Sequence, residues 1–269
     1  MATQSTYLLC TDLDRTLLPN GDVQEQHGAR QRFSALAAHP SITLAYVSGR
    51  DRSRIEEAIK RYHLPMPNYA VADVGTSIYT IEHSEWQPLQ SWNTVLASTW
   101  TLDVRRQIPE RLTDLPILAQ TGDRQGRFKQ SYTSDPNLDK TPLIEEIEKR
   151  LQGLPIEQVW SRDDVTGERL LDILPAGIDK LAAVRMLQQQ CQVEDNHTFF
   201  AGDSGNDLAV LTSSVPSVLV GNAEEQVQAQ ARKLAQQAGH LQSLHMAQAY
   251  YADGILEGFQ TFFTLSNNE

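Results

Sequence analysis

Short apolar runs alternate with amphipathic stretches at the start of the chain. Residues 7–10 are Tyr-Leu-Leu-Cys between polar neighbours, which is typical of a short strand buried on both faces. Helical spacing follows at 29–39, a second apolar run at 41–47, and a second helical stretch at 52–64. Two more short strands flank a turn at Gly75. This alternation predicts a parallel, right-handed, doubly wound sheet.

The pattern changes at about residue 83. From there to about residue 170, polar helices mix with short strands: 127–135 and 157–174 alternate like antiparallel strands, and 141–154 reads as an amphipathic helix. The strand–helix alternation then resumes, with helices predicted at 177–193, 223–238 and 253–263. We therefore expect an α/β core domain, residues 1–82 and 171–269, with an inserted α+β cap domain, residues 83–170.

Charge and composition narrow the class of protein. The 269 residues carry a net charge of -11, which argues against a nucleic acid or an anionic membrane surface as a partner. No apolar run approaches the length of a membrane span, and the N-terminus shows no signal-peptide pattern. Two cysteines make neither a disulfide framework nor a cysteine metal site. We expect a cytoplasmic enzyme or binding protein, which must place local positive charge if its substrate is an anion.

Two aspartates, Asp12 and Asp14, directly follow the first predicted strand. In an extended segment their side chains lie on the same face. Like charges this close raise one pKa or require a cation. The alternative is a simple turn or a helix cap, since aspartate favours both.

Three further polar clusters stand where strands end or a helix opens, and ligand sites of open α/β sheets lie at the carboxyl ends of the strands. They are Ser48-Gly49-Arg50, Lys180, and the run Gly202-Asp203-Ser204-Gly205-Asn206-Asp207. Each has an ordinary alternative by itself. Ser-Gly-Arg also suits a plain strand–helix connection, a lone lysine is commonly a solvated helix residue, and the Gly-Asp run also suits an isolated turn.

Together these motifs, "DLDRTL", "VSGR", "DK" and "GDSGND" in that order, resemble the haloacid dehalogenase (HAD) superfamily of aspartate-nucleophile phosphatases. The position of the insert, between the second and third motifs, resembles the cap class called C2. The segments "DVGTSIY", "FKQSYTSDP" and "DILP", with the C-terminal "YYADGILEGFQTFF", are most similar to the sucrose-phosphate phosphatase family. This resemblance implies a Rossmann-like HAD core and hydrolysis of a sugar phosphate.

The resemblance also implies roles for individual residues. Asp12 is the expected nucleophile, Asp14 the general acid and then base, Ser48 a donor to the phosphoryl oxygens, and Lys180 the neutralising cation. The expected cofactor is Mg²⁺, since a hard cation offsets repulsion between a carboxylate and a phosphate. Its expected ligands are Asp12, the backbone carbonyl of Asp14, Asp203 and, from nearby, Asp207. The expected substrate-binding residues are Gly49, Arg50, Gly75, Thr76, Ser77, Lys129 and Asn206.

The predicted function is Mg²⁺-dependent hydrolysis of a disaccharide or glycosyl phosphate, such as sucrose 6-phosphate, through an aspartyl-phosphate. One departure leaves the sugar open: the family's Gly-Lys-Asp cap segment corresponds here to Gly167-Glu168-Arg169, with one extra residue before "DILP". Two enzymatic alternatives are a sugar phosphomutase-type phosphotransferase and a phosphatase of broad specificity for small sugar phosphates. A third alternative is a non-enzymatic partner. We expect a monomer, and association with a glycosyltransferase that makes the substrate remains open.

Overall fold

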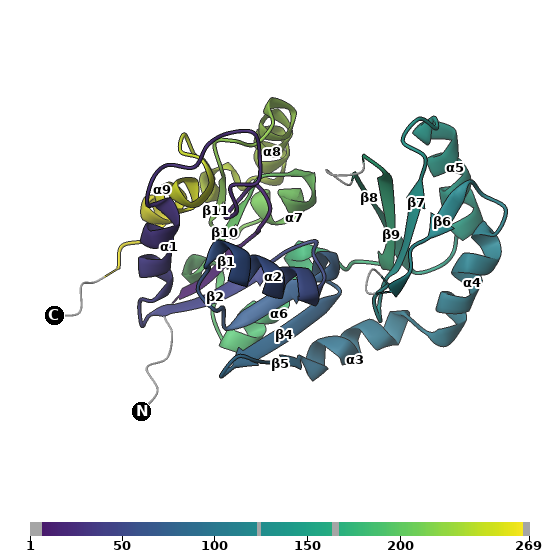
Figure 1. The fold of residues 1–269 in the computed structure, drawn as a ribbon, viewed down its shortest axis with the longest axis horizontal. Coiled ribbons are helices and arrows are strands. Elements are labelled where there is room, and N and C mark those ends of the chain that lie inside the picture. Colours follow the sequence, from purple (N-terminus) through teal and green to yellow (C-terminus); the bar gives the residue numbers. More distant parts are fainter. Residues whose placement is uncertain (1–6, 123–124, 163–166, 266–269) are drawn as a thin grey trace. The chain divides into compact units, whose positions relative to one another are not determined.

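The computed structural model describes residues 7–122, 125–162 and 167–265 (Figure 1). The chain divides into two compact units. The larger unit comprises the described parts of residues 1–87 and 179–269, and the smaller unit comprises the described parts of residues 88–178.

An eight-stranded sheet forms the centre of the larger unit, in the order β12-β11-β10-β1-β2-β3-β4-β5. The strands are β1 (Tyr7–Thr11), β2 (Ile42–Val47), β3 (Tyr69–Ala72), β4 (Ser77–Glu82), β5 (Glu85–Pro88), β10 (Thr198–Gly202), β11 (Ser217–Leu219) and β12 (Leu244–Met246). All ladders from β12 to β3 are parallel, and β4 runs antiparallel to β3. Leu8, Leu9 and Cys10 of β1 are fully buried, as expected of a central strand covered on both faces. The predicted doubly wound α/β core is confirmed.

The helices of the larger unit connect these strands. They are α1 (Ala29–Ala37), α2 (Arg52–Tyr62), α6 (Lys180–Cys191), α7 (Leu208–Leu211), α8 (Glu225–Ala238) and α9 (Tyr251–Phe262), with single turns η1 (Asp73–Gly75), η3 (Asp195–His197), η4 (Gly205–Asp207) and η5 (Leu241–Ser243). The ring of Phe259 on α9 packs edge-on against Phe199 on β10, with centroids 5.5 Å apart. Gly258 lets α9 approach the sheet, because a Cβ there would lie 2.4 Å from the Val218 Cβ. These contacts bury the apolar face of the closing helix.

The smaller unit is a four-stranded antiparallel sheet with three helices. Its strands, in the order β6-β7-β9-β8, are β6 (Ile117–Ala119), β7 (Gln130–Ser134), β8 (Ile156–Arg162) and β9 (Arg169–Pro175), and its helices are α3 (Gln90–Thr99), α4 (Leu102–Leu112) and α5 (Lys140–Leu151). Leu171 and Ile173 on β9, Ile108 on α4 and Ile147 on α5 are buried. This is the α+β unit expected from the sequence.

The limits of the two units differ from those expected at 83 and 170. Strand β5 belongs to the larger sheet, and all of β9 pairs with β8 in the smaller one. An expected boundary at residue 170 would cut β9 in two. The composition does not change near residue 170, so only the pairing of β9 with β8 shows to which sheet these residues belong. Residues 163–166 of the predicted strand region and residues 1–6 of the predicted core lie outside the described residues.

Candidate active site

The first two acidic residues meet because their strands are neighbours. Asp12 directly follows β1, and Asp203 directly follows β10. Thr11 pairs with Ala201 in this parallel ladder, and the Asp12 N–H donates to the Ala201 carbonyl at 2.9 Å. Carboxyl ends of adjacent parallel strands therefore bring together two side chains from opposite halves of the sequence.

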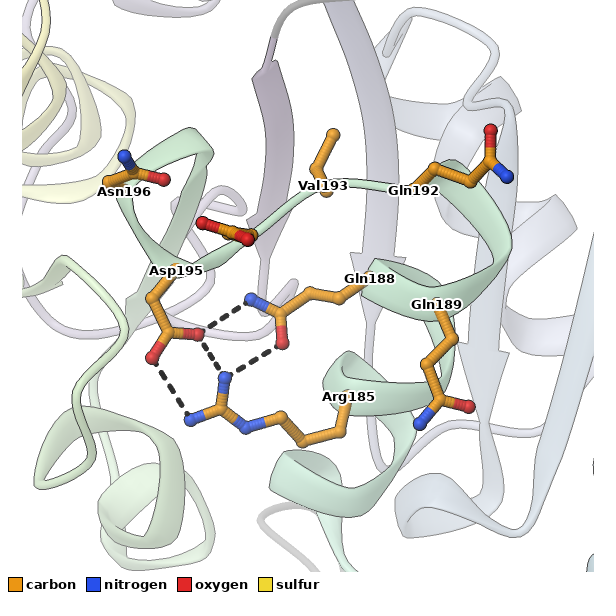
Figure 2. A pocket seen from close by; sticks show the side chains of 8 residues that line it. Arg185, Gln188, Gln189, Gln192, Val193, Asp195 and Asn196 are labelled. Atoms are coloured by element: carbon orange, nitrogen blue, oxygen red, sulfur yellow. Dashed lines mark hydrogen bonds and ion pairs between the residues drawn. The ribbon is translucent and has the colours of Figure 1, made fainter.

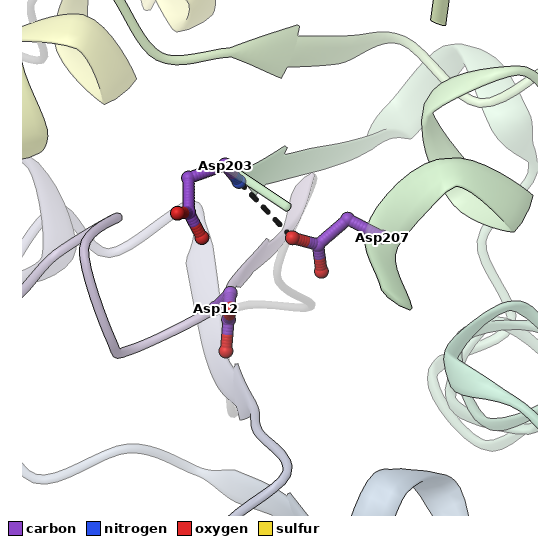
Figure 3. Close-up of side chains that lie close together, drawn as sticks. All are labelled: Asp12, Asp203 and Asp207. Atoms are coloured by element: carbon purple, nitrogen blue, oxygen red, sulfur yellow. Dashed lines mark hydrogen bonds between the residues drawn. The ribbon is translucent and has the colours of Figure 1, made fainter. Parts of the chain in front are cut away.

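Asp207 completes a buried acidic cluster with Asp12 and Asp203 (Figure 3). Each of the three offers a carboxylate oxygen, and these oxygens all lie within 4.8 Å of one another. The Asp207 Oδ2 accepts hydrogen bonds from the N–H groups of Asp203 and Ser204, both at 3.0 Å. A Cβ at Gly202 would lie 2.5 Å from the Asp207 Cγ, so only glycine leaves room for this carboxylate.

The cluster has the chemistry of a site for a hard divalent cation. Burial raises the pKa of Asp12 well above its usual range, and Asp207 and Asp203 raise it further. Burial and Asp207 raise the pKa of Asp203 to about 7. A cation relieves this repulsion, and oxygen ligands suit Mg²⁺. The three carboxylates of this cluster therefore fit the expected cofactor, and the part assigned to the Asp14 backbone carbonyl stays a prediction.

Lys180 lies between two members of the acidic cluster, Asp12 and Asp207. Its side chain is fully buried, and its Nζ lies 3.1 Å from the Asp12 Oδ2 and 2.6 Å from the Asp207 Oδ1. Burial alone would lower the pKa of Lys180, but these two carboxylates raise it above its ordinary value. The lysine is therefore a buried cation of the site and not a solvated helix residue.

The Asp14 side chain is held apart from this cluster by an arginine and an asparagine. Arg50 donates to both carboxylate oxygens, from Nε at 2.7 Å and from Nη2 at 2.6 Å. Asn20 Nδ2 donates to Oδ1 at 2.6 Å. Burial opposes the effect, but the bonds from Arg50 lower the pKa of Asp14. Asp14 is therefore ionised in this arrangement, and Arg50, predicted to bind substrate, is engaged here with Asp14.

Ser48 forms hydrogen bonds with other residues of the larger unit. Ser48 is fully buried, its N–H donates to the Val71 carbonyl at 2.9 Å, and its Oγ accepts from the N–H of Arg50 at 3.2 Å. The loop at Gly49 thus begins a tight connection from β2 to α2. A role for Ser48 and Gly49 toward a phosphate stays a prediction.

The other predicted substrate residues of the larger unit have partners in their own turns. The Thr76 hydroxyl donates to the Asp73 carbonyl at 2.9 Å, and the Ser77 hydroxyl to the Asp73 Oδ2 at 3.3 Å. Asn206 Oδ1 accepts from the Ser204 hydroxyl at 3.0 Å. The Ser204 hydroxyl also donates to the Asp207 Oδ2 at 3.3 Å. The sequence analysis gave Ser204 no role.

Two residues of the first motif to which the sequence analysis gave no role contact Asp203. The Thr16 hydroxyl donates to the Asp203 Oδ1 at 3.2 Å. The Arg15 Nε lies 3.6 Å from the Asp203 Oδ2, on a backbone with a φ of 56°. Their place within "DLDRTL" was the available signal, because residues after Asp14 must turn back across the end of β1.

Lys129 belongs to the smaller unit and is buried. Its Nζ lies 3.7 Å from the Asp172 Oδ1, which also accepts a hydrogen bond from the Ser131 hydroxyl. A solvated strand residue is therefore the wrong description of Lys129. Arg169, one of the residues that depart from the family pattern, donates to the carbonyls of Leu138 and Pro136, so it fastens the loop between β7 and α5.

A pocket of about 750 Å³ lies elsewhere in the larger unit, around the C-terminal end of α6 (Figure 2). Arg185 pairs there with Asp195, and Gln188 donates to the same carboxylate at 2.9 Å. None of the predicted site residues lines this pocket. Arg185 and Asp195 neutralise each other there, and the buried acidic cluster with Lys180 lies elsewhere, so we do not assign the chemistry to this pocket.

A family model of sucrose-6F-phosphate phosphohydrolase matches residues 5–263. The chain belongs to this family. It is a phosphoric monoester hydrolase of the HAD superfamily, as the four ordered motifs predicted. Within the described ranges, no helix is long and apolar enough to cross a membrane.

Members and neighbours of the sucrose-6F-phosphate phosphohydrolase family support this placement. A HAD-like hydrolase of Nitrosococcus oceani is 42% identical in an alignment of 267 positions that covers 95% of this chain and 71% of that protein. The sucrose-phosphatase of Synechocystis sp. PCC6803, solved with sucrose and phosphate, is 28% identical with a TM-score of 0.79, covering 97% of this chain and 99% of that one. A glucosylglycerol-phosphate synthase of Pseudomonas anguilliseptica is 29% identical over 95% of this chain, which spans only 30% of the synthase.

Proposed function

We propose that this enzyme removes phosphate from a disaccharide or glycosyl phosphate, such as sucrose 6-phosphate, through an aspartyl-phosphate on Asp12. The observation that carries this proposal is the pairing of Asp12 with the buried Lys180 at 3.1 Å, beside Asp203 and Asp207. A carboxylate beside a buried ammonium group is prepared to meet an anionic phosphoryl group. The sugar is proposed from family membership and from the sucrose and phosphate bound in the Synechocystis neighbour.

The proposed reaction has two displacements at phosphorus. The Asp12 carboxylate attacks, the bond from phosphorus to the sugar oxygen breaks, and Asp14 gives that oxygen its proton. Asp14 then takes a proton from a water molecule, whose oxygen attacks the phosphorus of the aspartyl-phosphate. The bond to Asp12 breaks, inorganic phosphate leaves, and both aspartates return to their starting states.

The remaining groups handle charge. Lys180 neutralises the phosphoryl oxygens and also separates the charges of Asp12 and Asp207, and Ser48 donates a hydrogen bond to the phosphoryl group. Mg²⁺, held by Asp12, Asp203 and Asp207 with the Asp14 carbonyl, would offset the repulsion between the nucleophile and the phosphate.

We also propose that the enzyme works beside the glycosyltransferase that makes its substrate. The support is that a sequence similar to 95% of this chain occurs within a longer synthase in Pseudomonas anguilliseptica. Co-purification with such a synthase would support the association, whereas a fully active, isolated monomer would make it unnecessary.

The deciding experiment measures phosphate release with Mg²⁺ from sucrose 6-phosphate, other disaccharide phosphates, glucosylglycerol phosphate and hexose 6-phosphates. Asp12→Asn should lose all turnover and keep its fold, and Asp22→Asn, the same change at an exposed aspartate, should retain full activity. Residual activity of Asp12→Asn above about a tenth of wild type would contradict its role as nucleophile. Transfer of the phosphoryl group to a sugar hydroxyl instead of water would support a mutase.

A further inference from the structure

Three consecutive residues between β3 and β4 adopt the left-handed backbone conformation. The φ angles are 53° at Asp73, 58° at Val74 and 102° at Gly75. A β-branched residue such as valine is a genuine outlier there, and all three residues are buried. Strained turns of this kind persist only where their surroundings impose them, and they are concentrated at functional sites.

One side of this turn holds the loop that follows β2. The Asp73 N–H donates to the Arg50 carbonyl at 2.9 Å, and the Val74 N–H donates to the Ser48 carbonyl at 3.3 Å. These bonds fix the backbone of Ser48, which the proposed mechanism uses, and of Arg50, which contacts Asp14. The left-handed geometry points both N–H groups at the same loop.

The other side of the turn touches the start of α6. A Cβ on Gly75 would lie 2.5 Å from the Asp179 carbonyl oxygen and 2.8 Å from its carbonyl carbon. Asp179 is the N-cap of α6 and accepts from the Ala182 N–H at 2.8 Å. The next residue is Lys180, whose Nζ must reach both Asp12 and Asp207. Because the atoms nearest to Gly75 belong to the Asp179 backbone, no flexible side chain could move aside for a Cβ.

We propose that η1, residues Asp73–Gly75, is a positioning element that sets Lys180 and the Ser48–Arg50 loop relative to one another, with Gly75 as the critical contact. The inference rests on the proposed function for the importance of Lys180, but not for the contact itself. It assigns Gly75 a role through Lys180, in place of the direct substrate contact expected from the sequence.

The test compares Gly75→Ala with Gly239→Ala. Gly239 also has a positive φ, of 76°, but a Cβ there meets nothing within 4 Å, so it controls for backbone strain alone. For Gly75→Ala we expect kcat to fall at least tenfold with KM within threefold of wild type, because Lys180 acts on the transition state. Direct substrate binding by Gly75 would instead raise KM and leave kcat unchanged.

A second measurement needs no substrate. In Gly75→Ala, Lys180 should be displaced from Asp12 and Asp207, so that it no longer competes with Mg²⁺ for these carboxylates. Calorimetry should therefore show Mg²⁺ binding to Gly75→Ala at least threefold more tightly than to Gly239→Ala. If Gly75→Ala does not fold, Val74→Gly provides the second test, because glycine suits the positive φ and leaves the contact between Gly75 and Asp179 in place. It should retain kcat and Mg²⁺ affinity, and a tenfold loss of kcat would assign the role to the valine and not to the Gly75 contact. Unchanged kcat and unchanged Mg²⁺ affinity in a folded Gly75→Ala would overturn the proposal, whatever the sugar substrate proves to be.

Discussion

Arg50 donates a hydrogen bond to each carboxylate oxygen of Asp14, at 2.7 and 2.6 Å. The residue proposed to protonate the leaving group is thus held as a carboxylate in this arrangement, with its pKa lowered. To act as an acid, Asp14 must gain a proton against this ion pair. Arg50 therefore makes the acid form scarce for the first step, and in the second step it supplies the ionised form of Asp14 but makes it a weaker base.

Removing Arg50 should change the pH dependence of the enzyme. In Arg50→Ala the ionised form of Asp14 loses two hydrogen bonds, so its pKa rises and its acid form survives to higher pH. Because Asp14 is more than a third exposed, we expect a modest shift of the basic limb of kcat/KM to higher pH. Arg52→Ala, which removes a neighbouring arginine paired with Glu56, is the control. If the pH profiles of Arg50→Ala and Arg52→Ala coincide, Arg50 does not set the pKa of Asp14.

Lys180→Met should be severe for both stability and catalysis. It leaves Asp12 and Asp207 buried without their cation, a change that typically lowers the free energy of unfolding by about 3–5 kcal/mol. Urea denaturation should show this loss in cation-free buffer and a partial recovery in Mg²⁺, while kcat falls at least about a hundredfold. Lys233→Met, at an exposed position of α8, should behave like wild type. A stable, active Lys180→Met would exclude the role assigned to this lysine.

Arg15 should weaken cation binding, because its guanidinium lies 3.6 Å from the Asp203 carboxylate. Arg15→Gln removes this charge, and a gain of about 1 kcal/mol, or about fivefold in affinity, is expected for a partly solvated charge pair at such a distance. Calorimetry with Mg²⁺ measures it, with Arg32→Gln as the control, since Arg32 pairs with Asp253. Weaker binding to Arg15→Gln would mean that Arg15 orients Asp203 and does not compete for it.

Lys129→Met tests the contribution of the smaller unit to sugar binding. If Lys129 contacts the sugar, KM for the disaccharide phosphate should rise about tenfold or more with the loss of a charged hydrogen bond. KM for p-nitrophenyl phosphate, which carries no sugar, should stay constant. Lys149→Met, an exposed change on α5, is the control. An equal rise for both substrates would instead make Lys129 a structural partner of Asp172.

The sequence was sufficient for the features that depend on strand order. Asp12 and Asp203 follow apolar runs that become adjacent parallel strands, so their meeting could be predicted from the rule for carboxyl ends. Lys180 was predicted from its place at the opening of a helix. Its complete burial was not, because burial depends on how α6 packs and not on its own spacing.

Other features could not be predicted because they depend on contacts between loops. The Asp14–Arg50 pair joins side chains from separate connections, and no spacing rule relates them. The turn at Asp73–Gly75 contradicts local preference, since valine disfavours a positive φ. Strand β9 was divided by the expected boundary, because its partners β7 and β8 are chosen by tertiary pairing.

The residues that are tolerated at position 202 can show whether a cell depends on the proposed reaction. Atoms of the Asp207 side chain lie 2.5–2.7 Å from where a Cβ at this position would be, so any larger residue expels the carboxylate. A library randomised at position 202 and selected for growth on a sugar phosphate should return glycine alone. The same library selected only for stable expression should also return alanine and serine, because Asp207 can then turn aside. The difference between the two outcomes would report, without any assay of the purified enzyme, whether a cell depends on this chemistry.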